Sequence, residues 1–187
     1  MSKALPWSVL ALAVMALIAL VFAQNDLRPV PPDSGAAPLG GAIGAPDISN
    51  MSPQERADRL FNRVMSLASE GKADSAAFFS PMALSALDAL APHSAHQRYD
   101  IGLIALVSGR PELAAAQADT ILAQRPTHLL GFALAIRAAE ARRDAAARTG
   151  FQRRLIAAEQ TELATGLQEY GDHNPDIIEA LRAARAP

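Results

Sequence analysis

The segment YDIGLIALVSGRP, Tyr99 to Pro111, combines an apolar run typical of a buried helix with two glycines. Gly102 lies inside the run, where glycine costs roughly 1 kcal/mol relative to alanine. We interpret it as a point of close approach by another helix, because glycine has no side chain to hold two backbones apart. Gly109 is expected to end the helix and Pro111 to begin the next one, since glycine favours the position after a helix and proline its first turn. The segment therefore predicts two closely packed antiparallel helices.

Similar start and stop signals recur along residues 52–187. Ser52 with Glu55 and Ser94 with Gln97 form the capping-box pattern of a helix start, and Gly71 is expected to end the first helix. Helices are expected at about 53–70, 95–108, 111–125, 127–142, 144–165 and 175–185, the last capped by Asn174, with two pieces in 73–91 separated by a break before Pro81. No segment has the pattern of a strand. The sequence predicts one all-α domain of short antiparallel helices over residues 52–187.

The window Ala95 to His128 spans 34 residues and resembles a tetratricopeptide repeat. Four residues match the small, turn and closing positions of that motif: Gly102, Gly109, Ala114 and Pro126. Arg98 stands where the motif has its strongest aromatic residue. The windows on either side match less well, with Ile136 and Arg143 in place of the two glycines in the later one. The resemblance implies an α-solenoid in which stacked helix hairpins complete each other's core.

Proteins of that family bind extended peptides or helices in a groove lined by the first helix of each hairpin. The resemblance therefore implies partner-binding positions at His96, Tyr99, Leu103, Leu106, Leu130, Ala133, Arg137 and Glu140. For several of these positions, Leu103 and Leu106 among them, burial in the core explains the residue equally well.

The N-terminal segment ALPWSVLALAVMALIALVFA, residues 4–23, carries no charge. Twenty helical residues span about 30 Å, the thickness of the hydrocarbon core of a bilayer. Lys3 precedes the segment, which favours a single-pass inner-membrane anchor (residues 1–23) with a cytoplasmic N-terminus and a periplasmic helical domain. The alternative is a signal peptide cleaved after Ala23, with secretion of the remainder. Residues 24–51 are rich in Pro, Gly and Ala and predict a flexible linker.

Composition excludes several kinds of chemistry. The chain has no cysteine, so it forms neither disulfides nor thiolate metal sites. Its formal net charge of −2 gives no general support for a nucleic-acid partner. Six arginines in residues 137–154 precede six acidic residues in 155–181. We expect these two groups to neutralise each other or face water, and an anionic-ligand patch is the alternative.

Motifs for catalysis are not found: there is no G-x-S-x-G elbow, no phosphate-binding loop after a strand and no evident carboxylate pair. No enzymatic activity, cofactor or metal is therefore predicted. The histidines are expected to be solvated residues at helix ends, with a metal site between His96 and His128 as the alternative. His173, in EYGDHNPD, is interpreted as part of the capping sequence before the last helix.

Two hypotheses of function follow. The first is a membrane-tethered, extracytoplasmic scaffold or adaptor that binds a protein partner in its groove. The second is a secreted periplasmic protein that binds a small ligand or a metal.

Overall fold

A computed structural model describes residues 51–186, and all regular structure in that range is helical. The helices are α2 (Pro53–Ser69), α3 (Ala73–Asp88), α4 (Ala95–Val107), α5 (Pro111–Gln124), α6 (Leu129–Ala141), α7 (Ala145–Leu163), α8 (Gln168–Asp172) and α9 (Asn174–Arg185). The all-α prediction is confirmed for this range. The predicted anchor, and the predicted linker up to residue 50, lie outside the described residues. Within 51–186, every helix is too short or too polar to cross a bilayer.

Both predicted capping boxes are present. The Ser52 hydroxyl accepts a hydrogen bond from the Glu55 backbone N–H at 3.2 Å, and the Glu55 carboxylate accepts one from the Ser52 N–H at 2.8 Å. Ser94 and Gln97 make the same pair of bonds at 3.2 and 2.9 Å. These contacts satisfy backbone donors that have no partner inside the helix, and they fix where α2 and α4 begin.

The predicted break before Pro81 is wrong, because α3 continues through it. Proline removes one helical hydrogen bond, a local cost that burial can outweigh. Four residues at helical spacing on α3 are buried: Ala76, Ser80, Ala83 and Leu87. The prediction that Asn174 caps the last helix is also wrong. Asn174 is the first residue of α9, and the N-cap residue is His173, whose side chain makes no capping hydrogen bond within residues 51–186.

Three turns of one type end α2, α4 and α6. The residues that follow the helix caps, Gly71, Gly109 and Arg143, have φ values of 72°, 68° and 58°. After each helix the same two backbone hydrogen bonds form: Gly71 to Ala68 and Lys72 to Leu67, Gly109 to Leu106 and Arg110 to Ala105, Arg143 to Glu140 and Asp144 to Ala139. This is the Schellman arrangement, in which a left-handed residue lets the chain reverse.

Arg143 is the exception in this series, because a residue with a Cβ pays about 1 kcal/mol in the left-handed region. We therefore expect Arg143→Gly to raise the free energy of unfolding by about 0.5–1 kcal/mol. Its neighbour Arg142, also exposed, has φ −84°, so Arg142→Gly is the matched control and is expected to be destabilising. Chemical denaturation of both variants measures the difference. Equal effects would show that the left-handed conformation carries no strain.

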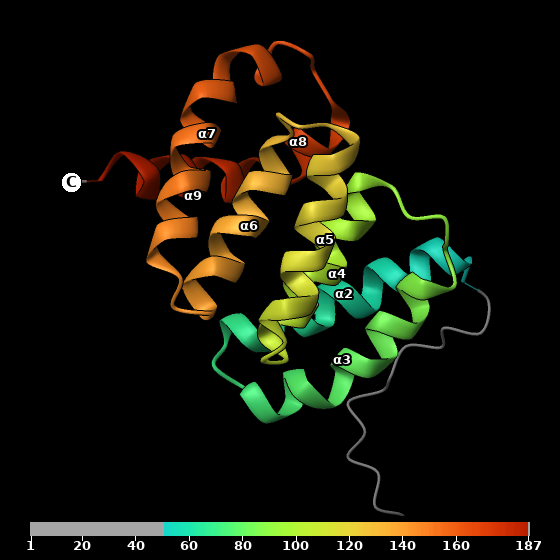
Figure 1. Ribbon diagram of the computed structural model, residues 1–187. Coiled ribbons are helices and arrows are strands. Elements are labelled where there is room, and N and C mark those ends of the chain that lie inside the picture. The colour runs from blue at the N-terminus through green and yellow to red at the C-terminus, as the bar shows by residue number, and fades with distance from the viewer. Residues whose placement is uncertain (1–50, 187) are drawn as a thin grey trace, which may run out of the picture. The chain divides into compact units, whose positions relative to one another are not determined.

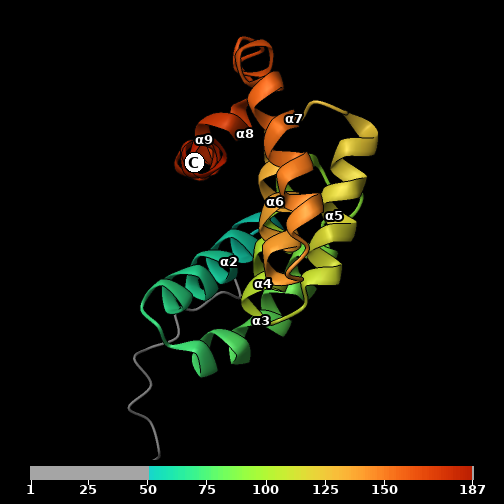
Figure 2. The same cartoon turned by 60° about the vertical axis from the view of Figure 1, so that its left-hand side comes forward.

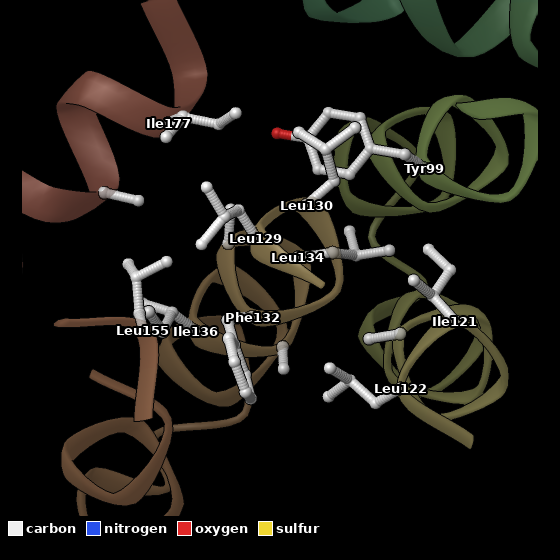
Figure 3. Packing of buried hydrophobic residues seen from close by; sticks show 14 of the residues in the cluster. Tyr99, Ile121, Leu122, Leu129, Leu130, Phe132, Leu134, Ile136, Leu155 and Ile177 are labelled. Carbon is white, nitrogen blue, oxygen red and sulfur yellow. The ribbon is translucent and has the colours of Figure 1, made fainter. Parts of the chain in front are cut away.

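Consecutive helices pack against each other from α2 to α7, and α4 also contacts both α2 and α6 (Figure 1). Helices α4 to α7 run side by side, whereas α9 is seen end-on in Figure 2 and therefore crosses α6 and α7, which it contacts. Buried side chains of α4, α5, α6, α7 and α9 form one hydrophobic core (Figure 3). A second core cluster joins α2 and α3 to Ile101 and Ile104 of α4.

Gly102 lies at a close approach between helices. A Cβ placed there would lie 2.3 Å from Cδ2 of Leu134, a residue of α6. The sequence predicted a close approach between α4 and its hairpin partner α5. The close approach is instead between α4 and α6. Ala114 of α5 is fully buried, and Pro126 is exposed in the turn before α6.

Candidate functional site

The residues expected to line a groove do not form an open surface. Half of them are buried in the core: Tyr99, Leu103, Leu130 and Ala133. His96, Leu106 and Arg137 are partly buried, and Glu140 is exposed. The predicted surface position is wrong for Tyr99, Leu130 and Ala133, and for Leu103 the alternative of burial in the core is the one observed.

The C-terminal helices contribute to the burial of Tyr99 and Leu130. Ile177 and Leu181 of α9 and Tyr170 of α8 belong to the same hydrophobic core as Leu130 and Tyr99. In Figure 3 the Ile177 side chain points toward Leu130 and Tyr99. Segment 168–185 therefore covers the face of α4 and α6 that the sequence analysis left open.

A cleft of about 700 Å³ lies elsewhere, between α2, α4 and α8. We call it the polar cleft. Its lining residues are Gln54, Asp58, Phe61, Asn62, Ser94, His96, Gln97, Asp100, Gln168, Glu169, Asp172 and His173. Four of them are carboxylates, and among the described residues no lysine or arginine lines it. The polar cleft therefore has a negative lining and suits a positively charged group.

Three residues at the base of the polar cleft form what we call the imidazole cluster: His96, Asp100 and His173. His96 and Asp100 are one helical turn apart on α4, and His173 lies between α8 and α9. Nε2 of His96 is 3.4 Å from Oδ2 of Asp100, and Nε2 of His173 is 3.4 Å from Oδ1 of the same carboxylate. The two imidazole rings are 4.7 Å apart.

The cluster is largely removed from water. Asp100 is 4% exposed and His173 is 8% exposed, whereas the His96 side chain is 37% exposed toward the cleft. Asp100 accordingly sits between a buried and an accessible imidazole. A hydrogen bond from the His96 imidazole to the Asp100 carboxylate is the main cause that raises the pKa of His96, and burial opposes it.

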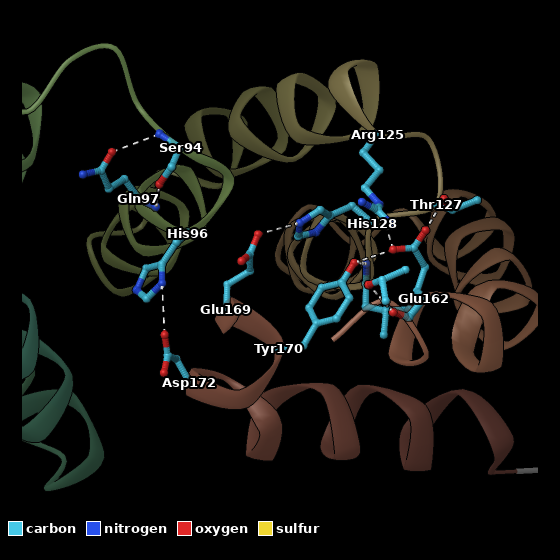
Figure 4. Close-up of polar contacts among 12 residues, drawn as sticks. Ser94, His96, Gln97, Arg125, Thr127, His128, Glu162, Glu169, Tyr170 and Asp172 are labelled. Atoms are coloured by element: carbon cyan, nitrogen blue, oxygen red, sulfur yellow. Dashed lines mark hydrogen bonds and ion pairs between the residues drawn. The ribbon is translucent and has the colours of Figure 1, made fainter. Parts of the chain in front are cut away.

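Each imidazole has a further carboxylate at its other nitrogen. Nδ1 of His173 is 3.4 Å from Oδ2 of Asp176, and Nδ1 of His96 is 3.7 Å from Oδ2 of Asp172 (the latter pair is drawn in Figure 4). Asp176 also accepts a hydrogen bond from Arg137 at 2.8 Å. The hydrogen bond from His173, with the charge of Arg137, holds the pKa of Asp176 below its usual value although burial opposes this.

Two atoms of the imidazole cluster stay unsatisfied. Oδ1 of Asp100 and Nε2 of His173 are buried and meet no hydrogen-bond partner among the described residues. The 3.4 Å between them is within ion-pair range, but the orientation is not that of a hydrogen bond. Buried polar atoms without partners are uncommon, and they mark either a strained contact or a place for an ion or water.

A second polar network lies around Glu162, near the C-terminal end of α7 (Figure 4). Its carboxylate accepts hydrogen bonds from Arg125 (2.8 Å), Thr127 (2.5 Å) and the Tyr170 hydroxyl (2.7 Å). That hydroxyl also accepts a bond from the Leu129 backbone N–H at 3.2 Å. Every contact holds together two segments of the chain, so we interpret this network as structural.

The alternative site between His96 and His128 is not formed, and the expectation of solvated histidines is wrong for His128 and His173, which are buried. His128 packs against Tyr170 with ring centres 5.1 Å apart, and its Nε2 is 3.4 Å from Glu169. His96 is instead joined by His173, which the sequence analysis took as capping sequence. In the sequence, the acidic neighbours of His173 in EYGDHNPD were the available indication that it belongs to a site. His173 reaches His96 only because the chain returns toward α4 after α7.

The arginine-rich segment is partly neutralised, as expected. Arg137 lies 2.8 Å from Asp176 and 3.1 Å from Glu179, both on α9. Arg154 of α7 packs over the Phe132 ring at 4.8 Å. These contacts join α6 to α9 and α7 to α6.

Comparison of the chain with protein-family models, with curated proteins and with solved structures finds no match. The polar cleft and its residues are therefore the features from which a function is inferred.

Proposed function

We propose that the chain is a membrane-tethered, extracytoplasmic interaction scaffold, and that a protein partner binds to its helical domain. The support for the tether is the uncharged segment of residues 4–23 with Lys3 before it. The linker up to residue 51 gives the domain reach from the membrane surface.

We further propose that residues 52–187 are a tetratricopeptide-like stack whose outer repeats have diverged. The three Schellman turns after α2, α4 and α6 support this, because they occur at equivalent places in successive helix pairs. The turns at Gly109 and Arg143 are 34 residues apart, which is the length of one repeat window in the sequence. Packing of α4 against both α2 and α6 agrees with stacked hairpins, each completing the core of the next.

The partner is proposed to enter the polar cleft with a positively charged segment. The observation that carries this is the lining of four carboxylates without a described lysine or arginine. Segment 168–185 contributes to the core at the face where a groove-bound partner was expected, and the cleft of about 700 Å³ offers another surface for a ligand. Complementary charge speeds association and excludes acidic competitors.

A charge reversal at the cleft tests this proposal. Asp58 is exposed on α2 and lines the cleft, and Asp119 is exposed on α5. We expect Asp58→Lys to weaken binding of a labelled Ala-Arg repeat peptide about fivefold at low salt, since one exposed charge pair is worth up to about 1 kcal/mol. Fluorescence anisotropy with the full-length chain in nonionic detergent measures this.

Asp119→Lys changes the net charge equally and is the matched control, expected to stay within about twofold of the unmodified chain. The same peptide with Glu in place of Arg is expected not to bind. Equal weakening by both variants would show that the peptide follows net charge, and the cleft would not be the binding surface.

Photo-crosslinking in cells then identifies the partner. A crosslinker at Asn62, exposed on the wall of the cleft, is expected to capture a protein that the same group at Arg153 of α7 does not. A partner captured from both positions, or only from Arg153, would argue against the cleft.

A further inference from the structure

The geometry points to a binding site for one divalent transition-metal ion, of the Zn²⁺ or Fe²⁺ class, between His96, Asp100 and His173. This inference does not depend on the proposed partner, because it concerns the base of the cleft and is tested with metal alone.

The ligand set is the first argument. Two imidazole nitrogens and one carboxylate oxygen are a common protein set for Zn²⁺ and for non-haem Fe²⁺. One ligand atom from each residue lies within 4.8 Å of the other two. Tetrahedral ligands about 2.0–2.1 Å from a metal are roughly 3.3 Å apart. Nε2 of His96 is 3.4 Å from Oδ2 of Asp100, and Nε2 of His173 is 3.4 Å from Oδ1, so each imidazole lies at about that distance from a different oxygen of the carboxylate.

The outer carboxylates are the second argument. Histidine ligands commonly donate their other N–H to a carboxylate, which fixes the tautomer and turns the free nitrogen to the metal. Oδ2 of Asp176 lies 3.4 Å from Nδ1 of His173 and Oδ2 of Asp172 lies 3.7 Å from Nδ1 of His96, so each imidazole has a carboxylate near its outer nitrogen. Arg137 in turn holds Asp176 in place.

The unsatisfied atoms are the third argument. With the proton at Nδ1, Nε2 of His173 presents a lone pair toward Oδ1 of Asp100, and two buried acceptors then face each other. Neither has a hydrogen-bond partner among the described residues. A cation between them satisfies both, whereas burial without one is unfavourable.

Access and charge also agree with a metal. His96 is partly exposed to a cleft of about 700 Å³, so an ion can reach the site from the cleft. The coordination positions that the three residues do not fill would face the water in the cleft. Asp100, Asp172 and Asp176 around the two imidazoles favour a doubly charged cation. A site with three protein ligands and one free coordination position resembles metal sites that bind water or substrate more than structural sites with four protein ligands.

Metal titration of the full-length chain tests the site. The chain is purified in nonionic detergent, stripped with a chelator, and titrated with Zn²⁺ against a chromophoric indicator. We expect one Zn²⁺ per chain with a Kd of about 1 µM or lower. Co²⁺ is expected to give a visible absorption band that Zn²⁺ abolishes, a readout that needs no variant.

Variants locate the ion. His96→Gln and Asp100→Asn are expected to weaken Zn²⁺ binding at least about 30-fold, and Asp176→Asn, which removes only an outer carboxylate charge, about tenfold. His93→Gln is the matched control, because His93 lies just before α4 with Nε2 3.1 Å from the Leu87 carbonyl, outside the cluster. It is expected to bind as the unmodified chain does. Circular dichroism of the metal-free variants checks that each is folded.

Two results would overturn the inference. One is the absence of saturable Zn²⁺ binding and of a Co²⁺ absorption band at metal concentrations up to about 100 µM. That result would mean that a shared proton, and not a metal ion, lies between the imidazoles and Asp100. The other is binding that survives in folded His96→Gln and Asp100→Asn, or is lost equally in His93→Gln.

Discussion

Gly102→Leu is expected to lower the free energy of unfolding by about 3 kcal/mol, at the upper end for overpacking, although leucine is the better helix former. A Cβ at position 102 would meet the Leu134 side chain at 2.3, 2.7 and 3.0 Å. Leu134 is fully buried in the main core and has little space to move away. The loss should appear as a melting temperature lower by roughly 10 °C.

Gly150→Ala is the control for this prediction. Gly150 lies within α7, and a Cβ there meets nothing within 4 Å. Alanine should therefore raise the free energy of unfolding by about 0.5–1 kcal/mol through helix propensity alone. If Gly102→Leu stabilised the chain as Gly150→Ala does, α4 and α6 would not approach each other as described.

Glu162→Ala is expected to lower the free energy of unfolding by roughly 3 kcal/mol at pH 7, because it removes three hydrogen bonds to a buried charge. Glu162 is 3% exposed, and the buried Tyr170 hydroxyl would lose its acceptor. Chemical denaturation measures the loss. Glu112→Ala, at an exposed position of α5, is expected to stay within about 0.5 kcal/mol. Similar losses in the two variants would show that the network adds nothing to stability.

The same residue predicts a pH dependence. Burial raises the pKa of Glu162, but the hydrogen bonds from Thr127, Tyr170 and Arg125 outweigh it, and the pKa lies below its usual value. A carboxyl whose pKa is lowered by folding stabilises the protein above its unfolded pKa of about 4.3, and this contribution is lost as the pH falls through the folded pKa. The difference between the unmodified chain and Glu162→Gln should therefore shrink below about pH 4.5. A difference that stays constant from pH 7 to pH 3 would contradict the lowered pKa.

The sequence predicted those elements whose cause is local. Ser52 with Glu55, and Ser94 with Gln97, fix helix starts within four residues, and Gly109 ends α4 through its own backbone conformation. Arg143 adopts the same conformation without a glycine. The sequence separated the two helices at this residue, but an arginine gives no indication that the turn needs a left-handed conformation.

The site depended on contacts between distant parts of the chain. His96 and Asp100 are recognisable as neighbours on one helix, but His173 reaches them only because α8 and α9 return toward α4. The same return buries Leu130 and Tyr99, which the groove hypothesis placed on the surface. Helix periodicity identifies an apolar face without identifying the segment that covers it.

The position of segment 168–185 against α4 and α6 decides which surface of the domain is open to a partner. A single cysteine in this cysteine-free chain measures it directly. Leu130→Cys places a thiol in the buried core near Ile177 of α9, and Glu140→Cys places one at an exposed position of α6, the helix that also carries Leu130. In the folded chain we expect a thiol reagent to label the Leu130→Cys variant at least about 100-fold more slowly than the Glu140→Cys variant, because labelling of a buried thiol requires local opening. In denaturant we expect both variants to be labelled at the same rate. Equal rates in the folded chain would contradict the account, because the α4–α6 face would then be open to a partner.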